Sequence, residues 1–210
     1  MSRMTPLYIL GTGLLAEEFL ALALTSGFSV EAFVENLDLS KAGSSLCDRP
    51  VIGVNDLPQG APCVCALSTT KRRQYIEQVA DRATFVNLVH PSSCILPGTT
   101  LGEGSIASTG VLVGSNTRIG RHVFLNRGTR VGHHARIGDF VTIQPGANIA
   151  GAGEIGDETY VGMGAIILER LTIGRGVTIA AGSLVKRDVP DYALVAGSPA
   201  TIKKQGVEPR

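Results

Sequence analysis

Apolar residues recur at every sixth position through the second half of the chain. Fifteen of the sixteen members of this series are branched aliphatic residues, and its register never slips. An α-helix repeats every 3.6 residues and a strand every two, so neither explains a period of six. Short strands separated by turns instead predict a triangular column, in which three units of six residues close one coil. The members are Ile95, Leu101, Ala107, Val113, Ile119, Leu125, Val131, Ile137, Ile143, Ile149, Ile155, Val161, Ile167, Ile173, Ile179 and Val185.

Two other positions of the six-residue unit support this column. Glycine often follows the aliphatic residue, which suits a tight corner where a β-carbon would be unwelcome. Small or β-branched residues often stand two places before the aliphatic residue, where we expect them to fill the remaining inner volume. The glycines are Gly114, Gly120, Gly132, Gly138, Gly156, Gly162 and Gly174, and the second set includes Thr117, Val123, Thr129, Ala135, Val141, Ala147, Thr159 and Ala165.

The first ninety residues show a different pattern, typical of a small parallel α/β unit. Residues 7–10 predict a buried strand, residues 15–24 a helix and residues 30–34 a second strand. Two further predicted strands, at 63–67 and 84–88, flank a helical stretch at 71–80. This unit is too short for a complete dinucleotide site, which needs two such halves, so a mononucleotide is the better expectation.

A glycine-rich turn, Gly11-Thr12-Gly13, joins the first predicted strand to the helix. Such a turn presents backbone N–H groups and a helix N-terminus to a phosphate, and Glu35 follows the next strand, where it could reach a ribose hydroxyl. The same pattern also fits a tight turn that binds nothing. Both interpretations stay open from the sequence.

Composition and charge narrow the classes of partner. The formal net charge is +1 and only 5% of residues are aromatic, with no Trp, so nucleic acid is not an expected partner. The apolar run at residues 7–10 is too short for a signal peptide, and no stretch is long enough to span a bilayer, so we expect a cytoplasmic protein. The four cysteines have no metal-ligand spacing and are expected to be reduced thiols.

Five segments together resemble the bacterial nucleotide-sugar acetyltransferases of the hexapeptide-repeat superfamily, the group of sialic acid O-acetyltransferases and N-acetyltransferases of UDP- and dTDP-linked 4-amino sugars. The segments are Gly11-Thr12-Gly13, residues 66–68 ahead of Arg73, residues 86–91, residues 125–133 and the closing residues 195–200. The resemblance implies a small Rossmann-like α/β domain over residues 1–90, followed by a left-handed parallel β-helix over residues 91–210. The left hand comes from the resemblance, because the period alone does not fix it.

The resemblance also implies a function in polysaccharide biosynthesis: transfer of an acetyl group from acetyl-CoA to the amine of a UDP- or dTDP-linked 4-amino-4,6-dideoxy sugar, without a metal. It implies a homotrimer with acetyl-CoA between neighbouring subunits, and flat prism faces favour such closed packing. Membranes are not expected partners. Expected acetyl-CoA contacts are Gly151, Met163, Ala181, Gly197 and Lys203, and expected nucleotide-sugar contacts are Gly11, Gly13, Glu35 and Arg73.

The resemblance places the catalytic base at His133. An imidazole titrates near neutral pH and can take the proton that a sugar ammonium must lose before it attacks a thioester. His134 is expected to tune the site or to be a solvated corner residue or, alternatively, to be the base itself. Asn126 matches a position near the acceptor sugar, or it is a corner residue in a left-handed conformation.

The chain departs from the family at two places, and three alternatives remain. The neighbours of His133 are Gly132 and His134, where some members have carboxylates that orient the ring, and Thr142 stands where at least one relative has a second histidine. The alternatives are sialic-acid-type transfer to a sugar hydroxyl, a zinc-dependent carbonic-anhydrase-like protein and a non-catalytic scaffold. His122 and His134 are twelve residues apart and should lie on different faces, which argues against zinc. Lys203 and Lys204 in the tail fit either a CoA-binding closure or a solvated end.

Overall fold

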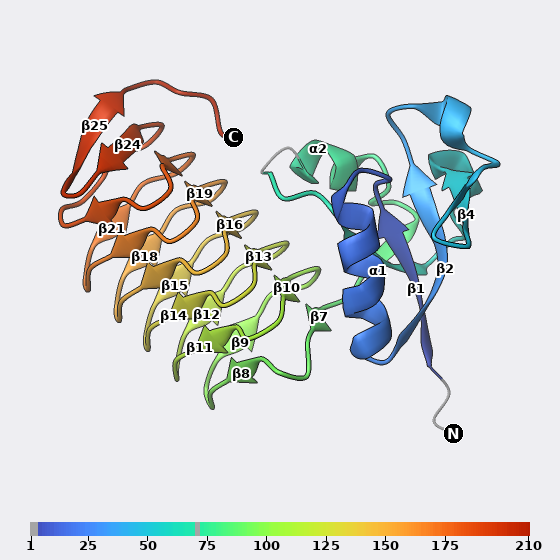
Figure 1. The fold of residues 1–210 in the computed structure, drawn as a ribbon, viewed down its shortest axis with the longest axis horizontal. Helices are drawn as coiled ribbons and strands as arrows, with labels where there is room; N and C mark the ends of the chain where they lie inside the picture. Colours follow the sequence, from blue (N-terminus) through green and yellow to red (C-terminus); the bar gives the residue numbers. More distant parts are fainter. Residues whose placement is uncertain (1–3, 70–71) are drawn as a thin grey trace.

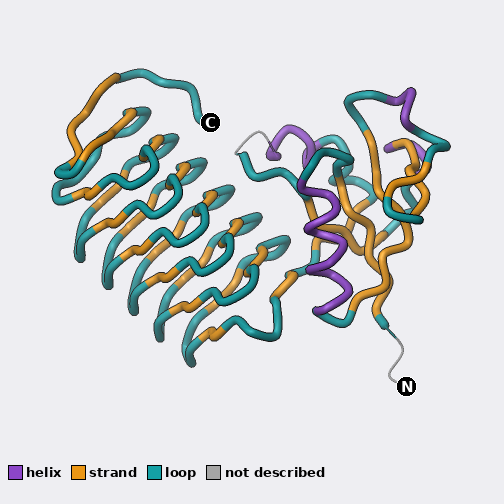
Figure 2. The backbone as a smooth tube through the Cα atoms, in the orientation of Figure 1, coloured by secondary structure: helices purple, strands orange, loops and turns teal. Residues whose placement is uncertain are grey.

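A computed structural model describes residues 4–69 and 72–210 as an α/β domain followed by a left-handed β-helical column (Figure 1). Figure 2 shows the column as short strands joined by turns, with a coil at each level. Its strands form three parallel sheets, except that the last strand is antiparallel, and each column strand pairs with the strand one coil away. The six-residue period therefore predicted this half of the fold correctly.

We name the three sheets by what their outer faces carry. The covered sheet contains β7 (Leu88–Val89), β10 (Ile106–Ala107), β13 (Phe124–Leu125), β16 (Thr142–Ile143), β19 (Tyr160–Val161), β22 (Thr178–Ile179), β24 (Leu194–Gly197) and β25 (Ala200–Lys204). The apolar sheet contains β8 (Cys94–Ile95), β11 (Leu112–Val113), β14 (Arg130–Val131), β17 (Asn148–Ile149), β20 (Ile166–Ile167) and β23 (Leu184–Val185). The charged sheet contains β9 (Thr100–Leu101), β12 (Arg118–Ile119), β15 (Arg136–Ile137), β18 (Glu154–Ile155) and β21 (Thr172–Ile173).

The aliphatic series lines the axis of the column. Its members from Ala107 to Val185 are buried in one continuous core, together with the small residues two places before them. Two of the inner hydroxyl groups bond to the next coil: the Oγ1 atoms of Thr117 and Thr159 donate to the carbonyl oxygens of Gly132 and Gly174, each at 2.8 Å. The buried Oγ atom of Ser183 has no hydrogen-bond partner among the described residues. Because each coil buries its inner face only by stacking on the next, the column folds as a stack of coils.

The glycines after the aliphatic residues are required by stacking. A β-carbon at Gly132 would lie 2.5 Å from the backbone nitrogen of Gly151 in the coil above, closer than real contacts allow. The left-handed backbone conformation falls two residues later in the unit, at positions such as Asn116, His134 and Ala152, whose φ values lie between 56° and 57°. The sequence therefore predicted where a β-carbon is excluded. The residue with the left-handed backbone at each corner is not this glycine but the residue two places after it.

The N-terminal domain is built on a six-stranded sheet in the order β3-β4-β2-β1-β5-β6. Its elements are β1 (Thr5–Leu10), α1 (Leu15–Thr25), β2 (Phe28–Glu35), the 3₁₀ turn η1 (Leu39–Lys41), β3 (Ser45–Leu46), β4 (Arg49–Gly53), the 3₁₀ turn η2 (Val54–Asp56), β5 (Ala61–Cys65), α2 (Arg72–Glu77) and β6 (Ala83–Phe85). Cys63 and Cys65 are buried in it, and burial raises the pKa of each thiol to about 12, so both stay protonated.

The structure corrects several of the predicted boundaries. Strands β3 and β4 were not predicted, and α2 ends earlier than the predicted helix, whose first residue lies outside the described residues. The strand predicted at 84–88 is two elements: β6 ends at Phe85, while Leu88 begins β7, which pairs with β10 of the column. The column thus starts shortly before the expected boundary after residue 90.

Apolar residues on the outer face of the covered sheet hold the two domains together. Leu88, Ile106 and Phe124 point away from the axis into the core of the N-terminal domain, where they are at most 3% exposed. The ring of Phe124 packs against that of Phe19 from α1, with centroids 5.4 Å apart. Fully burying side chains of this size stabilises the fold by about 1.5–3 kcal/mol each, so the covered sheet fixes the N-terminal domain on one face of the column.

No helix in the described residues is long and apolar enough to cross a membrane.

Candidate functional site

The three corners of the column carry different chemistry, and we name each after one residue. The Asn126 corner joins the covered sheet to the apolar sheet, and the His133 corner joins the apolar sheet to the charged sheet. The His122 corner joins the charged sheet back to the covered sheet. His122 and His134 therefore lie on different corners, as predicted. No group of three His, Cys, Asp or Glu side chains able to hold a metal ion occurs among the described residues.

His133 and His134 form a contacting pair of exposed imidazoles. Their Nδ1 atoms lie 3.0 Å apart, within hydrogen-bond distance, and their ring planes are nearly perpendicular at 85°. The Nε2 atom of His134 lies 3.5 Å from the side-chain nitrogen of Asn116, one coil below. The structure thus gives His133 a side-chain partner, which the sequence left unidentified.

Gly151, one coil above, forms the wall beside the His133 ring. A β-carbon built on Gly151 would lie 3.0 Å from both Cε1 and Nε2 of that ring. The Gly151 backbone N–H has no hydrogen-bond acceptor among the described residues. At the His122 corner, by contrast, the matching N–H groups of Arg121 and Arg175 each donate to an aspartate at 2.8 Å. The His133 corner therefore offers an imidazole nitrogen beside an open backbone donor.

Asn126 is a buried member of a polar ladder that faces the N-terminal domain. Its Nδ2 atom donates to Oε1 of Gln144 at 3.2 Å, and its Oδ1 atom accepts from the backbone of Arg127 at 2.8 Å. The Nε2 atom of Gln144 reaches the carbonyl of Ser68 at 3.4 Å. The alternative interpretation of Asn126 as a left-handed corner residue is wrong, because Gly128 takes that conformation, with φ 64°.

The residues expected to bind acetyl-CoA do not lie together in one chain. Gly151 is on the His133 corner, whereas Met163 and Ala181 are exposed on the Asn126 corner, across the apolar sheet. Gly197 and Lys203 belong to the closing hairpin of β24 and β25, where both are exposed. Within one chain these residues therefore lie on three separate parts of the surface.

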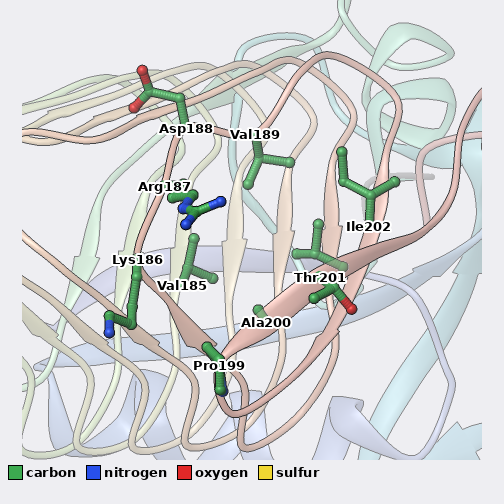
Figure 3. Close-up of a pocket in the computed structure, with 10 residues that line it drawn as sticks. Val185, Lys186, Arg187, Asp188, Val189, Pro199, Ala200, Thr201 and Ile202 are labelled. Atoms are coloured by element: carbon green, nitrogen blue, oxygen red, sulfur yellow. The ribbon is translucent and has the colours of Figure 1, made fainter.

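A cavity of about 480 Å³ lies at the end of the column beneath this hairpin (Figure 3). Its lining combines apolar side chains such as Val189 and Ile202 with the cations Lys186 and Arg187. Figure 3 shows Arg187 and Ile202 on opposite sides of it. Arg187 stands on the His133 corner, in the same row as Gly151, and the sequence analysis did not single it out.

Glu35 is committed to its own loop. Its Oε1 atom accepts from the backbone N–H groups of Asn36, Leu37 and Asp38 at 2.8–3.2 Å, and Oε2 accepts from the hydroxyl of Thr12. Burial alone would raise the pKa of this carboxyl, but these hydrogen bonds and Lys41, 3.7 Å away, lower it. Glu35 therefore organises the turn after β2, and its contact with a ribose stays a prediction.

The glycine turn has the expected shape, with an unfavourable charge for phosphate. Gly11 has φ 108° and Gly13 is exposed, and α1 follows directly. The first turn of α1 contains Glu17 and Glu18, which already complement the helix dipole and repel a phosphate. The role predicted for Gly11 and Gly13 also stays a prediction.

Arg73, expected at the nucleotide, forms part of the seam between the domains. Its guanidinium pairs with Glu158 of the column at 2.9 Å and with Glu77 of α2 at 2.8 Å, and it lies over the Phe140 ring. The neighbouring Arg72 is the anchor that the sequence analysis missed. It is 2% exposed and donates to the carbonyl oxygens of His122 and Val141 and to Thr142, 50 to 70 residues away.

His122 and His90 have structural surroundings. The His122 ring is 6% exposed, stacks on Phe140 with centroids 5.0 Å apart and meets the edge of Phe85. Burial, with the nearby charges of Arg72 and Arg121, lowers its pKa to about 4. His90 Nδ1 lies 2.7 Å from the hydroxyl of Ser92.

The repeat and the whole architecture both match known proteins. The family signature "Bacterial transferase hexapeptide (six repeats)" matches residues 116–151 and 153–187. A mutant of perosamine N-acetyltransferase from Caulobacter crescentus, in complex with CoA and GDP-perosamine, superimposes with a TM-score of 0.86 at 27% identity, covering 95% of this chain and 97% of that one. The chain thus carries the hexapeptide repeat of bacterial transferases and resembles a sugar N-acetyltransferase over nearly its whole length.

Other known proteins also resemble this chain, in whole or in part. The acetyltransferase domain of PglB from Neisseria gonorrhoeae, in complex with acetyl coenzyme A, gives a TM-score of 0.86 at 29% identity, covering 95% and 99% of the two chains. WeeI from Acinetobacter baumannii gives 0.81 at 26%, covering 95% and 100%. A segment of 40 residues, 19% of this chain, is 48% identical to 2,3,4,5-tetrahydropyridine-2,6-dicarboxylate N-acetyltransferase from Staphylococcus aureus, and it spans only 17% of that relative.

Proposed function

We propose that this protein is a cytoplasmic, acetyl-CoA-dependent N-acetyltransferase that acts on a 4-amino-4,6-dideoxy sugar linked to a nucleoside diphosphate. The observation that carries the proposal is the exposed imidazole of His133 beside the open N–H of Gly151. Two structural relatives that cover nearly the whole chain are described with CoA or acetyl-CoA, and one of these is described with GDP-perosamine. We therefore add GDP to the candidate nucleotides, UDP and dTDP.

Each group at the His133 corner has a role in direct transfer. The Nε2 atom of His133 takes a proton from the sugar ammonium, and the freed amine attacks the thioester carbonyl. The carbonyl oxygen becomes an oxyanion, which the N–H of Gly151 stabilises. The carbon–sulfur bond then breaks, and the adduct nitrogen gives its extra proton to the departing CoA thiolate. His133 releases the proton that it took from the ammonium to solvent, and the products are the N-acetyl sugar and CoA. No covalent bond to the enzyme is needed.

The row of residues above His133 suits the donor. Gly151, Glu169 and Arg187 follow at successive coils, so the row extends about 14 Å at roughly 4.8 Å for each coil. We place the thioester at Gly151 and the phosphates of CoA near Arg187, Lys186 and the closing hairpin, where cations and apolar surface occur together. Phosphates pair well with such cations.

The outer faces of the three sheets support a homotrimer. The covered sheet packs on its own N-terminal domain, and the outward residues of the charged sheet are Thr, Arg or Glu. The apolar sheet instead leaves Leu112 40% and Ile166 45% exposed, along with Cys94, and its outer face also carries Arg130 and Asn148. Three copies that bury this sheet around a threefold axis each cover the same patch.

The trimer also completes the active site. The apolar sheet lies between the His133 corner and the Asn126 corner, so threefold packing sets the His133 corner of one subunit against the Asn126 corner of the next. Gly151 then meets Met163 of the partner subunit and Ala181 of the partner subunit, which are separated from it within one chain. Asn126 of the partner subunit lies on the acceptor side, next to its N-terminal domain.

The test is CoA release from acetyl-CoA with a panel of UDP-, dTDP- and GDP-linked 4-amino sugars. His133→Ala should lower turnover by about 10²- to 10⁴-fold, because general-base catalysis contributes that much, while the trimer stays intact. His90→Ala, which removes an imidazole from the first coil of the column, two coils below Asn126, is the matched control. Normal turnover in His133→Ala would remove His133 as the base. Acetylation of free sialic acid in place of the amino sugars would overturn the amine acceptor.

A further inference from the structure

The contact between His133 and His134 joins the same ring nitrogen of each side chain. Both atoms in the 3.0 Å contact are Nδ1. A neutral imidazole carries one N–H donor and one acceptor nitrogen, so exactly one of the two Nδ1 atoms carries the shared proton. The pair is thus able to select the tautomer of His133.

Only one of the two arrangements leaves His133 able to act as a base toward the Gly151 wall. If His133 holds the Nδ1 proton and donates it, its Nε2 atom keeps a free lone pair beside Gly151. His134 then accepts at Nδ1 and carries its own proton on Nε2. If His134 donates at Nδ1 instead, the proton of neutral His133 is on Nε2, and the atom that faces the acceptor cannot take another.

Asn116 can fix the choice from the far side of His134. Its side-chain amide lies 3.5 Å from the Nε2 atom of His134, and the two ends of an amide are distinguished only by their hydrogen bonds. With the oxygen turned toward His134, the amide accepts the Nε2 proton. The chain then runs in one direction: His133 Nδ1–H donates to His134, and His134 Nε2–H donates to Asn116.

We propose that His134 and Asn116 are positioning residues, which form a neutral relay that holds His133 in its Nδ1–H tautomer with Nε2 free for the acceptor amine. This inference rests on the proposed function, because it assigns the base of that reaction its tautomer. The relay has no carboxylate. Its acceptor for the His133 proton is an imidazole nitrogen, and the imidazolium formed during transfer keeps the same hydrogen bond.

The backbone at position 134 allows the side chain to be removed without strain. His134 has φ 56°, a conformation that glycine and asparagine adopt readily. His134→Gly deletes the acceptor for the His133 proton. His134→Asn keeps an acceptor, because its Oδ1 atom is attached to Cγ, as the Nδ1 atom of histidine is. Ala152→Gly is the matched control, since Ala152 occupies the same corner position one coil above, with φ 57°.

The first measurement is steady-state CoA release by the full-length protein. His134→Gly should lower kcat roughly 10- to 100-fold, as expected for the loss of a hydrogen bond to a charged group, with little change in KM for acetyl-CoA. His134→Asn should recover most of that loss, and Asn116→Gly should lower kcat less than His134→Gly does. A structural role for position 134 predicts full activity in both His134 variants, and a His134 base predicts that His134→Asn is as inactive as His134→Gly. Either result overturns the relay.

The second measurement does not need activity. A ¹⁵N spectrum of the histidine rings shows which nitrogen carries the proton, and the histidine variants assign the signals. We expect the Nδ1–H form for His133 and the Nε2–H form for His134 in the wild type, with His133 losing its preference in His134→Gly. An Nε2–H form of His133 in the wild type overturns the relay even if the enzyme is active. The expected tautomers in a protein that releases no CoA would instead refute the proposed function and leave the relay standing.

Discussion

Gly151→Ala tests the geometry of the active site with a single methyl group. The new β-carbon would lie 3.0 Å from both Cε1 and Nε2 of His133, whereas carbon atoms in good contact are about 3.5–4.0 Å apart. The ring must therefore retreat by roughly 0.5 Å. Gly151 does not have a left-handed φ, so its conformation suits alanine, and the one tight backbone contact of the new β-carbon is with the carbonyl oxygen of His133 at 3.2 Å.

We expect Gly151→Ala to lower kcat and to change the stability of the fold only slightly. His133 is exposed, so its ring can move into solvent, and we expect a stability cost below about 1 kcal/mol. A displacement of 1 Å costs about 100-fold in rate, so half of that should lower kcat by about 10-fold. Stopped assays of CoA release and thermal melts on the same preparation give both quantities.

Gly153→Ala is the control from the same coil. A β-carbon at Gly153 would lie 3.5 Å from the carbonyl oxygen of Leu171, an ordinary contact, at one of the inner positions that alanine fills elsewhere in the column. We expect unchanged kcat and equal or slightly higher stability. Unchanged kcat in Gly151→Ala would show that the His133 ring does not depend on this wall, and the proposed position of the thioester would fall with it.

Two further predictions concern assembly and pH. Ile166→Lys places a charge in the proposed trimer interface, at a cost of about 3 kcal/mol for each subunit. We expect a folded protein that light scattering shows to be monomeric and that releases no CoA. Thr172→Lys, on the charged sheet, should stay trimeric, and a trimer in both variants would contradict the interface. His122 has a folded-state pKa of about 4 against 6.5 in the unfolded chain, so protonation favours unfolding. The stability that neutral His122 contributes to the fold is fully present above about pH 6.5 and is lost as the pH falls toward 4. The free energy of unfolding, measured with urea, should fall by on the order of 2 kcal/mol between pH 7 and pH 5. His122→Asn should largely abolish this fall, and asparagine suits the φ of 54° at this position. Equal losses in both proteins would contradict this assignment.

The sequence predicted those features that depend on local repetition. Each aliphatic residue of the series faces the axis because the same strand and turn recur, and burial at Val131 or Ile149 follows from that rule alone. The left-handed corner residues were not predicted, because glycine stands both at the stacking position and, as in Gly128, at the left-handed position. Strand β4 was missed since Pro50 interrupts a short run, a feature typical of loops or strand edges.

The sequence places residues of the candidate site together where they are neighbours in the chain or one coil apart. The proximity of His133, His134 and Gly151 follows from adjacency and the eighteen-residue pairing, whereas their roles were implied by the resemblance and stay predictions. Arg72 could not be found in this way, because its partners lie 50 to 70 residues away and only the domain seam brings them together. The apolar residues Ile106 and Phe124, one coil apart on the outer face, were a usable signal for that seam.

The pairing of each column residue with the one eighteen places later has a consequence for how such a chain can vary in length. Loss or gain of a single residue would turn every later side chain out of the axis. Removal or duplication of a whole coil would leave the axis intact and move the closing hairpin by about 4.8 Å. The distance from the histidine pair to the far end of the column can therefore change only by whole coils. A donor as long as acetyl-CoA has to fit one of these distances.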